Sequence, residues 1–226
     1  MRERDLSRAL RLCAYLLRYP DDGMRANLPA LRDALAQELA LPRGRAAELD
    51  RLAASMLSSD GFAVESAYIE LFDRSRSTSL HLFEHVHGES RDRGPAMVGL
   101  NETYAEAGLH LAPDEMPDYL PAVLEYASTQ PPAAAKAFLG ELAHLLNALF
   151  NALERRQSPY AAVLGALLEL AGEKAKPVAV PVDEPIDVAW EEPPVFGGCS
   201  SKGQTKPGTV QPINLVRAAP RAGVSA

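Results

Sequence analysis

Apolar side chains recur three or four residues apart through most of the first 175 residues of this 226-residue chain. Leu6, Leu10, Cys13 and Leu17 show this spacing near the start, and it continues to about residue 171. Side chains at this spacing share one face of a helix, so the pattern predicts amphipathic helices. No stretch alternates apolar and polar residues as a half-buried strand does. We therefore expect an all-α protein, a single bundle of eight or nine helices over residues 1–175.

Prolines, a glycine and an aspartate mark the expected helix boundaries. Pro20 ends the first helix, Asp60 can cap a later one, and Gly108 can end another. A further helix is expected after Pro117, and Pro121 lies within it. Because proline has no backbone N–H to donate, we expect the first turn of that helix to be irregular.

Residues 176–226 differ from the helical region in composition. They hold eight of the 18 prolines and show no helical period. This composition predicts a flexible, largely irregular Pro/Gly-rich tail. Its apolar islands, at residues 188–190, 195–196 and 213–216, could instead dock on the bundle or on a partner as short extended segments.

The charge balance argues against several classes of function. The chain has 23 basic and 30 acidic residues, a net charge of -7, which disfavours nucleic-acid binding and favours a basic peptide. No apolar run reaches the roughly 20 residues that cross a bilayer, and no signal-peptide pattern is present, so we expect no stable membrane insertion. Cys13 and Cys199 suggest neither a disulfide framework nor a metal knuckle, and a cytoplasmic location is expected.

Four of the five histidines lie between Tyr68 and Tyr126. His81 and His85 are four residues apart, so they share a helix face as zinc ligands can. No third ligand follows at a fixed offset, and such histidines can instead cap helix ends or hydrogen-bond buried carbonyls. A metal- or nucleotide-dependent enzyme that uses His81, His85 and Arg91 is the alternative function. No local catalytic signature supports it, and we expect no bound cofactor or metal.

The segment Gly88–Gly94 is a polar loop between glycines. It lacks the Gly-Lys-Ser/Thr ending of a phosphate-binding loop, which argues against a nucleotide site of that type. Arg91 and Arg93 are expected to form ion pairs that hold the loop against Glu84 or Asp73. They could instead meet a phosphate or carboxylate of a ligand.

A second polar group surrounds Pro117 and contains Asp114, Glu115 and Asp118. Carboxylates at a helix start cap free backbone donors and favour the positive end of the helix. This role accounts for one or two of them. A third, exposed carboxylate beside Tyr119 could receive an arginine from a partner, and the two interpretations have equal weight.

Three segments of this region resemble the NarJ family, the assembly chaperones of respiratory nitrate reductase within the wider group of redox-enzyme maturation chaperones. They are residues 68–73, 82–97 and 116–126. The most specific is the run Glu-His-x-x-Gly-x-Ser-Arg-x-Arg-Gly from Glu84 to Gly94. The wider group has a Glu-Pro-x-Asp-His-like motif where this chain reads Glu115 to Tyr119. Tyr119 stands in place of the histidine, so no role of that imidazole carries over.

The resemblance covers the whole helical part and implies a non-catalytic, cytoplasmic chaperone. It implies binding to the N-terminal segment of the catalytic (alpha) subunit of nitrate reductase. The client would be held until its iron-sulfur and molybdenum cofactors are inserted and it joins its membrane partners. Molybdenum cofactor biosynthesis proteins are further expected partners. A chaperone for another molybdoenzyme is the alternative client assignment.

An amphipathic client peptide needs an apolar groove between helices, and its basic residues would seek a carboxylate rim. We expect His85 and His87 to lie near this rim, so that peptide affinity changes between about pH 5 and 8. The candidate peptide-binding residues are Phe72, Asp73, Glu84, His85, His87, Arg91, Arg93, Met97, Tyr104, Glu115, Asp118 and Tyr119.

Overall fold

The computed structural model describes residues 6–86, 91–112 and 115–178, which fall within one compact unit, Met1–Asp183. Within these ranges the regular structure is helical, without a strand, and the expected all-α fold is confirmed. No helix in this part of the chain is both long and apolar enough to cross a membrane. The helices are α1 (Ser7–Leu16), α2 (Asp22–Ala26), α3 (Leu28–Ala36), α4 (Arg43–Ser58), α5 (Gly61–Tyr68), η1 (Ile69–Asp73), η2 (Arg76–Thr78), α6 (Leu82–Val86), α7 (Arg93–Glu106), α8 (Leu120–Thr129), α9 (Pro132–Arg155) and α10 (Ala161–Ala171).

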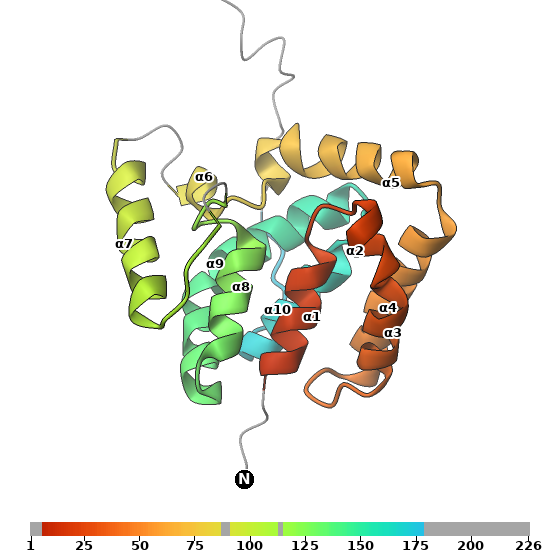
Figure 1. Cartoon of the computed structure of the whole chain (residues 1–226), viewed down its shortest axis with the longest axis horizontal. Coiled ribbons are helices and arrows are strands. Elements are labelled where there is room, and N and C mark those ends of the chain that lie inside the picture. Colours follow the sequence, from red (N-terminus) through yellow and green to blue (C-terminus); the bar gives the residue numbers. More distant parts are fainter. Residues whose placement is uncertain (1–5, 87–90, 113–114, 179–226) are drawn as a thin grey trace, which may run out of the picture. The chain divides into compact units, whose positions relative to one another are not determined.

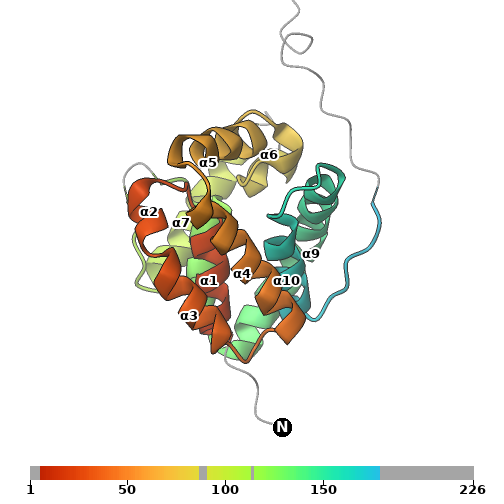
Figure 2. The ribbon, with the colours of Figure 1, turned by 90° about the vertical axis from the view of Figure 1, so that its right-hand side faces the viewer.

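The core forms where α1 packs against α8 and α9 packs against α10 (Figure 1). Nine of the eleven residues of α10 are buried, because this helix is apolar on nearly all sides. Leu10 and Leu16 of α1 and Leu124 of α8 have no exposed surface. Helices α5 and α6 lie across one end of the bundle, as Figures 1 and 2 both show.

The local boundary predictions had different outcomes. Asp60 caps α5 as predicted, since its carboxylate accepts the backbone N–H of Ala63 at 3.1 Å. The short helix α2, capped by Asp21 through the N–H of Met24 at 2.6 Å, was not predicted. The irregular turn expected at Pro121 was a wrong prediction. Helix α8 begins only at Leu120, so Pro121 lies in its first turn, where no intrahelical donor is needed.

After α10 the chain turns back along α9. Gly172 ends α10 with a positive φ of 83°. Lys176 then exchanges two backbone hydrogen bonds with the side chain of Asn147, at 2.8 and 2.9 Å, and its carbonyl also accepts from Asn151. The segment before Val178 is therefore fixed to α9. The predicted tail lies almost wholly outside the described residues and stays a prediction.

Candidate functional site

Asp118 is a buried carboxylate at the junction of the two polar groups found in the sequence. Its side chain has no exposed surface. Its Oδ2 accepts the backbone N–H of Phe83 at 3.1 Å, and its backbone carbonyl accepts the N–H of Leu82 at 3.0 Å. Asp118 thus satisfies free donors in the first turn of α6. This burial contrasts with the exposed carboxylate that the sequence suggested for the group around Pro117.

Two basic side chains approach the Asp118 carboxylate. His81 Nδ1 lies 3.4 Å from Oδ1, and the guanidinium of Arg93 lies 3.9 Å from Oδ2. The hydrogen bond to Asp118 raises the pKa of His81, although partial burial of the ring opposes this effect. Arg93 also lies 3.7 Å from Glu84, which confirms one of the ion pairs predicted for the loop. A buried carboxylate is tolerated here because it is hydrogen-bonded and faces opposite charge.

A short backbone ladder joins the segments before α6 and before α8. His81 and Tyr119 form an isolated antiparallel bridge. The N–H of Leu120 donates to the carbonyl of Leu80 at 2.9 Å, beside the bond between Leu82 and Asp118. The rings of His81 and Tyr119 lie 5.4 Å apart, inclined by 33°. The two polar groups of the sequence therefore form one structural unit.

Tyr119 links this unit to the end of α1. Its hydroxyl lies 3.1 Å from the hydroxyl of Tyr68 and 3.3 Å from the carbonyl of Leu17. Tyr68 donates to the same carbonyl at 2.8 Å. Burial raises the pKa values of both phenols, so both stay neutral and able to donate. The carbonyl of Leu17, which lacks a helical partner, is thereby satisfied by side chains.

Helix α7 is attached to the bundle mainly at its ends. Tyr104 is its only buried residue, and the Tyr104 hydroxyl donates to the carbonyl of Pro117 at 2.8 Å. The Tyr104 ring lies 5.0 Å from that of Tyr126 on α8. Arg93 fixes the other end through its contacts with Glu84 and Asp118. Figure 1 shows α7 at the edge of the bundle.

The other predicted site residues are dispersed. Phe72 is buried among aromatic rings. Its ring centroid lies 4.8 Å from that of the Tyr68 ring and 4.9 Å from that of the Tyr160 ring, so Phe72 belongs to the core. Asp73 is on the exposed side of the end of η1, although neighbouring protein atoms desolvate its carboxylate enough to raise its pKa. Met97 is half-buried on α7, and Arg91 is exposed just before it.

His85, like His81, has a structural partner. His85 Nε2 lies 2.8 Å from the buried carbonyl of Ser79, as the hydrogen-bonding interpretation predicted. His87 lies outside the described residues. Within the described ranges no three His, Cys, Asp or Glu side chains come together as a metal site.

Two surface hollows flank the segment from Glu115 to Tyr119. One, of about 580 Å³, lies beside Tyr15, Tyr19, Glu115 and Tyr119. The other, of about 390 Å³, is lined by Tyr15 and Glu115 together with Tyr104 of α7 and several residues of α8. Because both include Tyr15 and Glu115, they adjoin. Tyr15 is not among the residues that the sequence predicts for the site. Its only signal was a position on the face of the first helix opposite the leucines.

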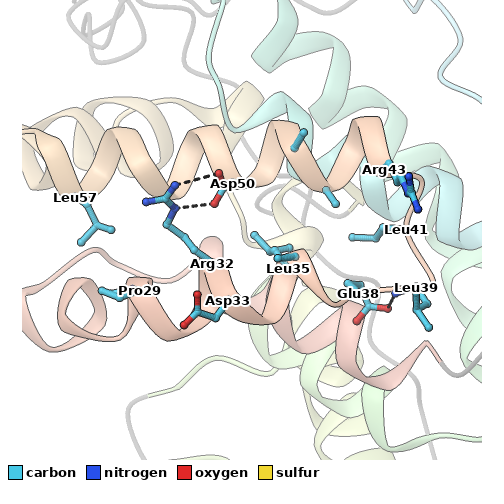
Figure 3. A pocket seen from close by; sticks show the side chains of 13 residues that line it. Pro29, Arg32, Asp33, Leu35, Glu38, Leu39, Leu41, Arg43, Asp50 and Leu57 are labelled. Atoms are coloured by element: carbon cyan, nitrogen blue, oxygen red, sulfur yellow. Dashed lines mark hydrogen bonds and ion pairs between the residues drawn. The ribbon is translucent and has the colours of Figure 1, made fainter.

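A larger cavity, of about 930 Å³, lies elsewhere, between α3 and α4. Figure 3 shows Arg32 of α3 reaching across it to Asp50 of α4. Their closest atoms are 2.6 Å apart. Leu35, Leu39 and other side chains line this cavity, but none of the predicted site residues does. Its size alone does not connect it with the polar groups of the sequence.

Comparison with known proteins identifies the family. The family model described as nitrate reductase delta subunit matches residues 19–165. The nitrate reductase molybdenum cofactor assembly chaperone NarJ of Escherichia coli (strain K12) is 40% identical over 187 residues, covering 78% of this chain and 79% of that protein. A Bacillus subtilis (strain 168) protein with a NarJ chaperone designation is 33% identical, covering 68% of this chain and 82% of its own length.

A solved structure supports the fold. A protein described as a redox enzyme maturation protein from Archaeoglobus fulgidus matches with a TM-score of 0.54 and 20% identity, covering 76% of this chain and 98% of that one. The sequence relatives are named as assembly chaperones and not as enzymes, in line with the expectation of a non-catalytic protein. The chain belongs to the nitrate reductase delta subunit family, the family of the NarJ assembly chaperones.

Proposed function

We propose that this chain is a cytoplasmic chaperone dedicated to the catalytic (alpha) subunit of a nitrate reductase. It binds the N-terminal segment of that subunit and keeps it open for insertion of the molybdenum and iron-sulfur cofactors and for membrane assembly. Proteins of molybdenum cofactor biosynthesis meet the client while it is held. Family membership supports the chaperone role, and the names of the relatives support the choice of client.

The observation that carries the proposal is the pair of hollows that adjoin at Tyr15 and Glu115. Together they combine aromatic rings with carboxylates, which suits an amphipathic segment carrying basic residues. Glu115 is exposed, and its carboxylate forms no ion pair with any described residue. It is therefore available to a cation from the client.

Asp118 is buried beneath this surface and fixes the position of the segment that forms it. Its bonds to Phe83 and its proximity to Arg93 fix the turn that follows Glu115. Tyr119 is held through its hydroxyl at the end of α1. Preorganised contact residues reduce the entropy lost on binding, so these bonds favour client affinity without touching the client.

A peptide of the first ~15 residues of the client, long enough to span both hollows as a helix, tests the proposal by calorimetry. We expect Glu115→Gln to weaken binding several-fold, since it removes an exposed anion from the rim. Tyr15→Ala should weaken it further through lost apolar contact, with the fold checked by circular dichroism. Glu154→Gln is the matched control, because Glu154 is an exposed glutamate on α9 that lines neither hollow. If Glu115→Gln and Tyr15→Ala bind the peptide as tightly as Glu154→Gln and the unmodified chain do, these hollows are excluded as the site.

A second peptide distinguishes the client. The N-terminal segment of a different molybdoenzyme should bind much more weakly to the same protein. Tighter binding of that peptide would assign the chain to another client while leaving its chaperone role intact.

A further inference from the structure

The outer face of α1 is a surface with charge of opposite sign at its two ends. Arg8 and Arg11 lie toward its N-terminal end. A third hollow of about 560 Å³ adjoins them and shares Tyr15 with the two hollows already described. Toward the other end of α1, Asp21 and Glu115 line the hollow of about 580 Å³ together with Arg18. Tyr15 therefore lies between a basic end and an acidic end.

The charges at both ends are incompletely neutralised within the protein. Arg8 lies 3.9 Å from the carboxylate of Glu38, which is too far for a hydrogen bond, while its own side chain is half exposed. Arg11 donates to the neutral hydroxyl of Ser128 at 3.1 Å. Arg18 belongs to the acidic end. It lies 4.0 Å from Glu125, a contact as loose as that of Arg8 with Glu38, and it is one arginine against the two carboxylates of Asp21 and Glu115.

The dipole of α1 adds to this asymmetry. The C-terminal end of a helix carries a partial negative charge and its N-terminal end a partial positive charge. The end of α1 near Leu17 is followed closely by Asp21 on the chain. Arg8 and Arg11 lie in the first half of the helix. The side-chain charges and the helix dipole thus act in the same sense: both make the electrostatic potential more positive at the N-terminal end of this face and more negative at its C-terminal end.

We infer that the N-terminal segment of the client binds antiparallel to α1, with its amino terminus beside Asp21 and Glu115 and its chain leading toward Arg8 and Arg11. This inference rests on the proposed function. The free α-amino group and the N-terminal end of a helical segment are both positive, whereas the other end of that helix is negative. The ten residues of α1 span about 15 Å, which a helical segment of about ten residues matches.

A nitroxide label on a cysteine added before the first residue of the client peptide tests the direction. Bound to the full chain, this label should broaden the amide signal of Gly23, which lines the acidic end, more than that of Ala34, which lines the basic end. A label at the last residue of the peptide should produce the opposite pattern. Reversed patterns, or equal broadening from both labels, would overturn the direction while leaving the proposed function in place. If no signal changes and calorimetry detects no binding, the proposed function itself fails.

Acetylation of the peptide amino terminus provides an independent test. Loss of this charge should raise the Kd of the complex between the peptide and the chain without substitutions about two- to fivefold at low salt. The effect should shrink in Glu115→Gln, where Asp21 remains as the second carboxylate, and persist in full in Arg11→Gln, because Arg11 lies toward the other end of α1. The opposite outcome, loss of the effect in Arg11→Gln alone, would also overturn the direction. Arg43→Gln, at the separate cavity between α3 and α4, is the control and should behave as the unmodified chain does.

Discussion

Asp118 accepts the backbone N–H of Phe83 across 35 residues of sequence, and this buried bond ties the start of α6 to the segment before α8. The same carboxylate faces His81 and Arg93. One side chain therefore connects both polar groups recognised in the sequence. It contributes to the site by fixing the position of its neighbours, since it has no surface of its own to offer a client.

Replacement of Asp118 by alanine should destabilise the fold by about 3 kcal/mol. The change leaves the N–H of Phe83 without its acceptor, and it leaves Arg93 and the His81 ring without the carboxylate that they face. Asp118→Asn keeps an acceptor for Phe83 and should cost less than Asp118→Ala. Urea denaturation measures both. Asp33→Ala, at an exposed aspartate of α3, is the control and should change stability by less than about 0.5 kcal/mol.

Removal of the two phenolic hydroxyls at Leu17 should have unequal effects. Tyr68→Phe should cost about 1–1.5 kcal/mol, because Tyr68 is buried and donates the shorter bond. Tyr119→Phe should cost less, since Tyr119 is only half-buried and Tyr68 still satisfies the Leu17 carbonyl. Thermal melts of the two variants provide the comparison. A larger loss in Tyr119→Phe would contradict this division of roles.

The stability of the protein should fall as pH rises past the folded-state pKa of His81. That pKa is raised above its ordinary value of 6.5 by Asp118. A raised pKa means that the folded state binds the proton more tightly, so the stabilisation is complete below about pH 6 and is lost above the folded pKa. His81→Gln should flatten this part of the profile in urea melts at several pH values. Desolvation also raises the pKa of Asp73, so the comparison of His81→Gln with the unmodified chain is what isolates the contribution of His81.

The dependence of client affinity on pH stays a prediction. The sequence predicts this dependence at His85 and His87. In the structure His81 faces the buried carboxylate, whereas His85 bonds to the carbonyl of Ser79. Calorimetry between about pH 5 and 8 on His81→Gln and His85→Gln separates the two. An unchanged profile in His81→Gln would exclude His81 as the source.

The fold was accessible from the sequence because leucine spacing reports directly on which face of each helix is buried. The polar groups were also visible, since carboxylates, histidines and arginines are dense there. Which of these residues pair with one another could not be predicted. His81 and Asp118 are 37 residues apart and meet through a single bridge without a periodic pattern. The hollows around Tyr15 depend on segments that are far apart in the sequence packing side by side, and no local rule predicts such packing.

Two glycines should respond in opposite ways to alanine. Gly172 ends α10 with a positive φ, so Gly172→Ala should cost about 1 kcal/mol through backbone strain. Gly99 lies within α7, exposed and with open space around the position of a Cβ. Gly99→Ala should stabilise the protein by up to about 1 kcal/mol, because alanine loses less backbone entropy in a helix. Equal effects of the two changes in urea melts would contradict this contrast.

Cys13 should resist thiol reagents in the folded protein. Its side chain is fully buried in α1, and burial, assisted by nearby Glu38, raises its thiol pKa to about 12. The reactive thiolate is therefore both scarce and inaccessible at neutral pH. In a Cys199→Ser variant, which leaves Cys13 as the only thiol, the rate of modification by a disulfide reagent should rise with urea in parallel with unfolding. Rapid modification without denaturant would show that α1 opens locally, and it would then question α1 as a rigid wall of the proposed client site.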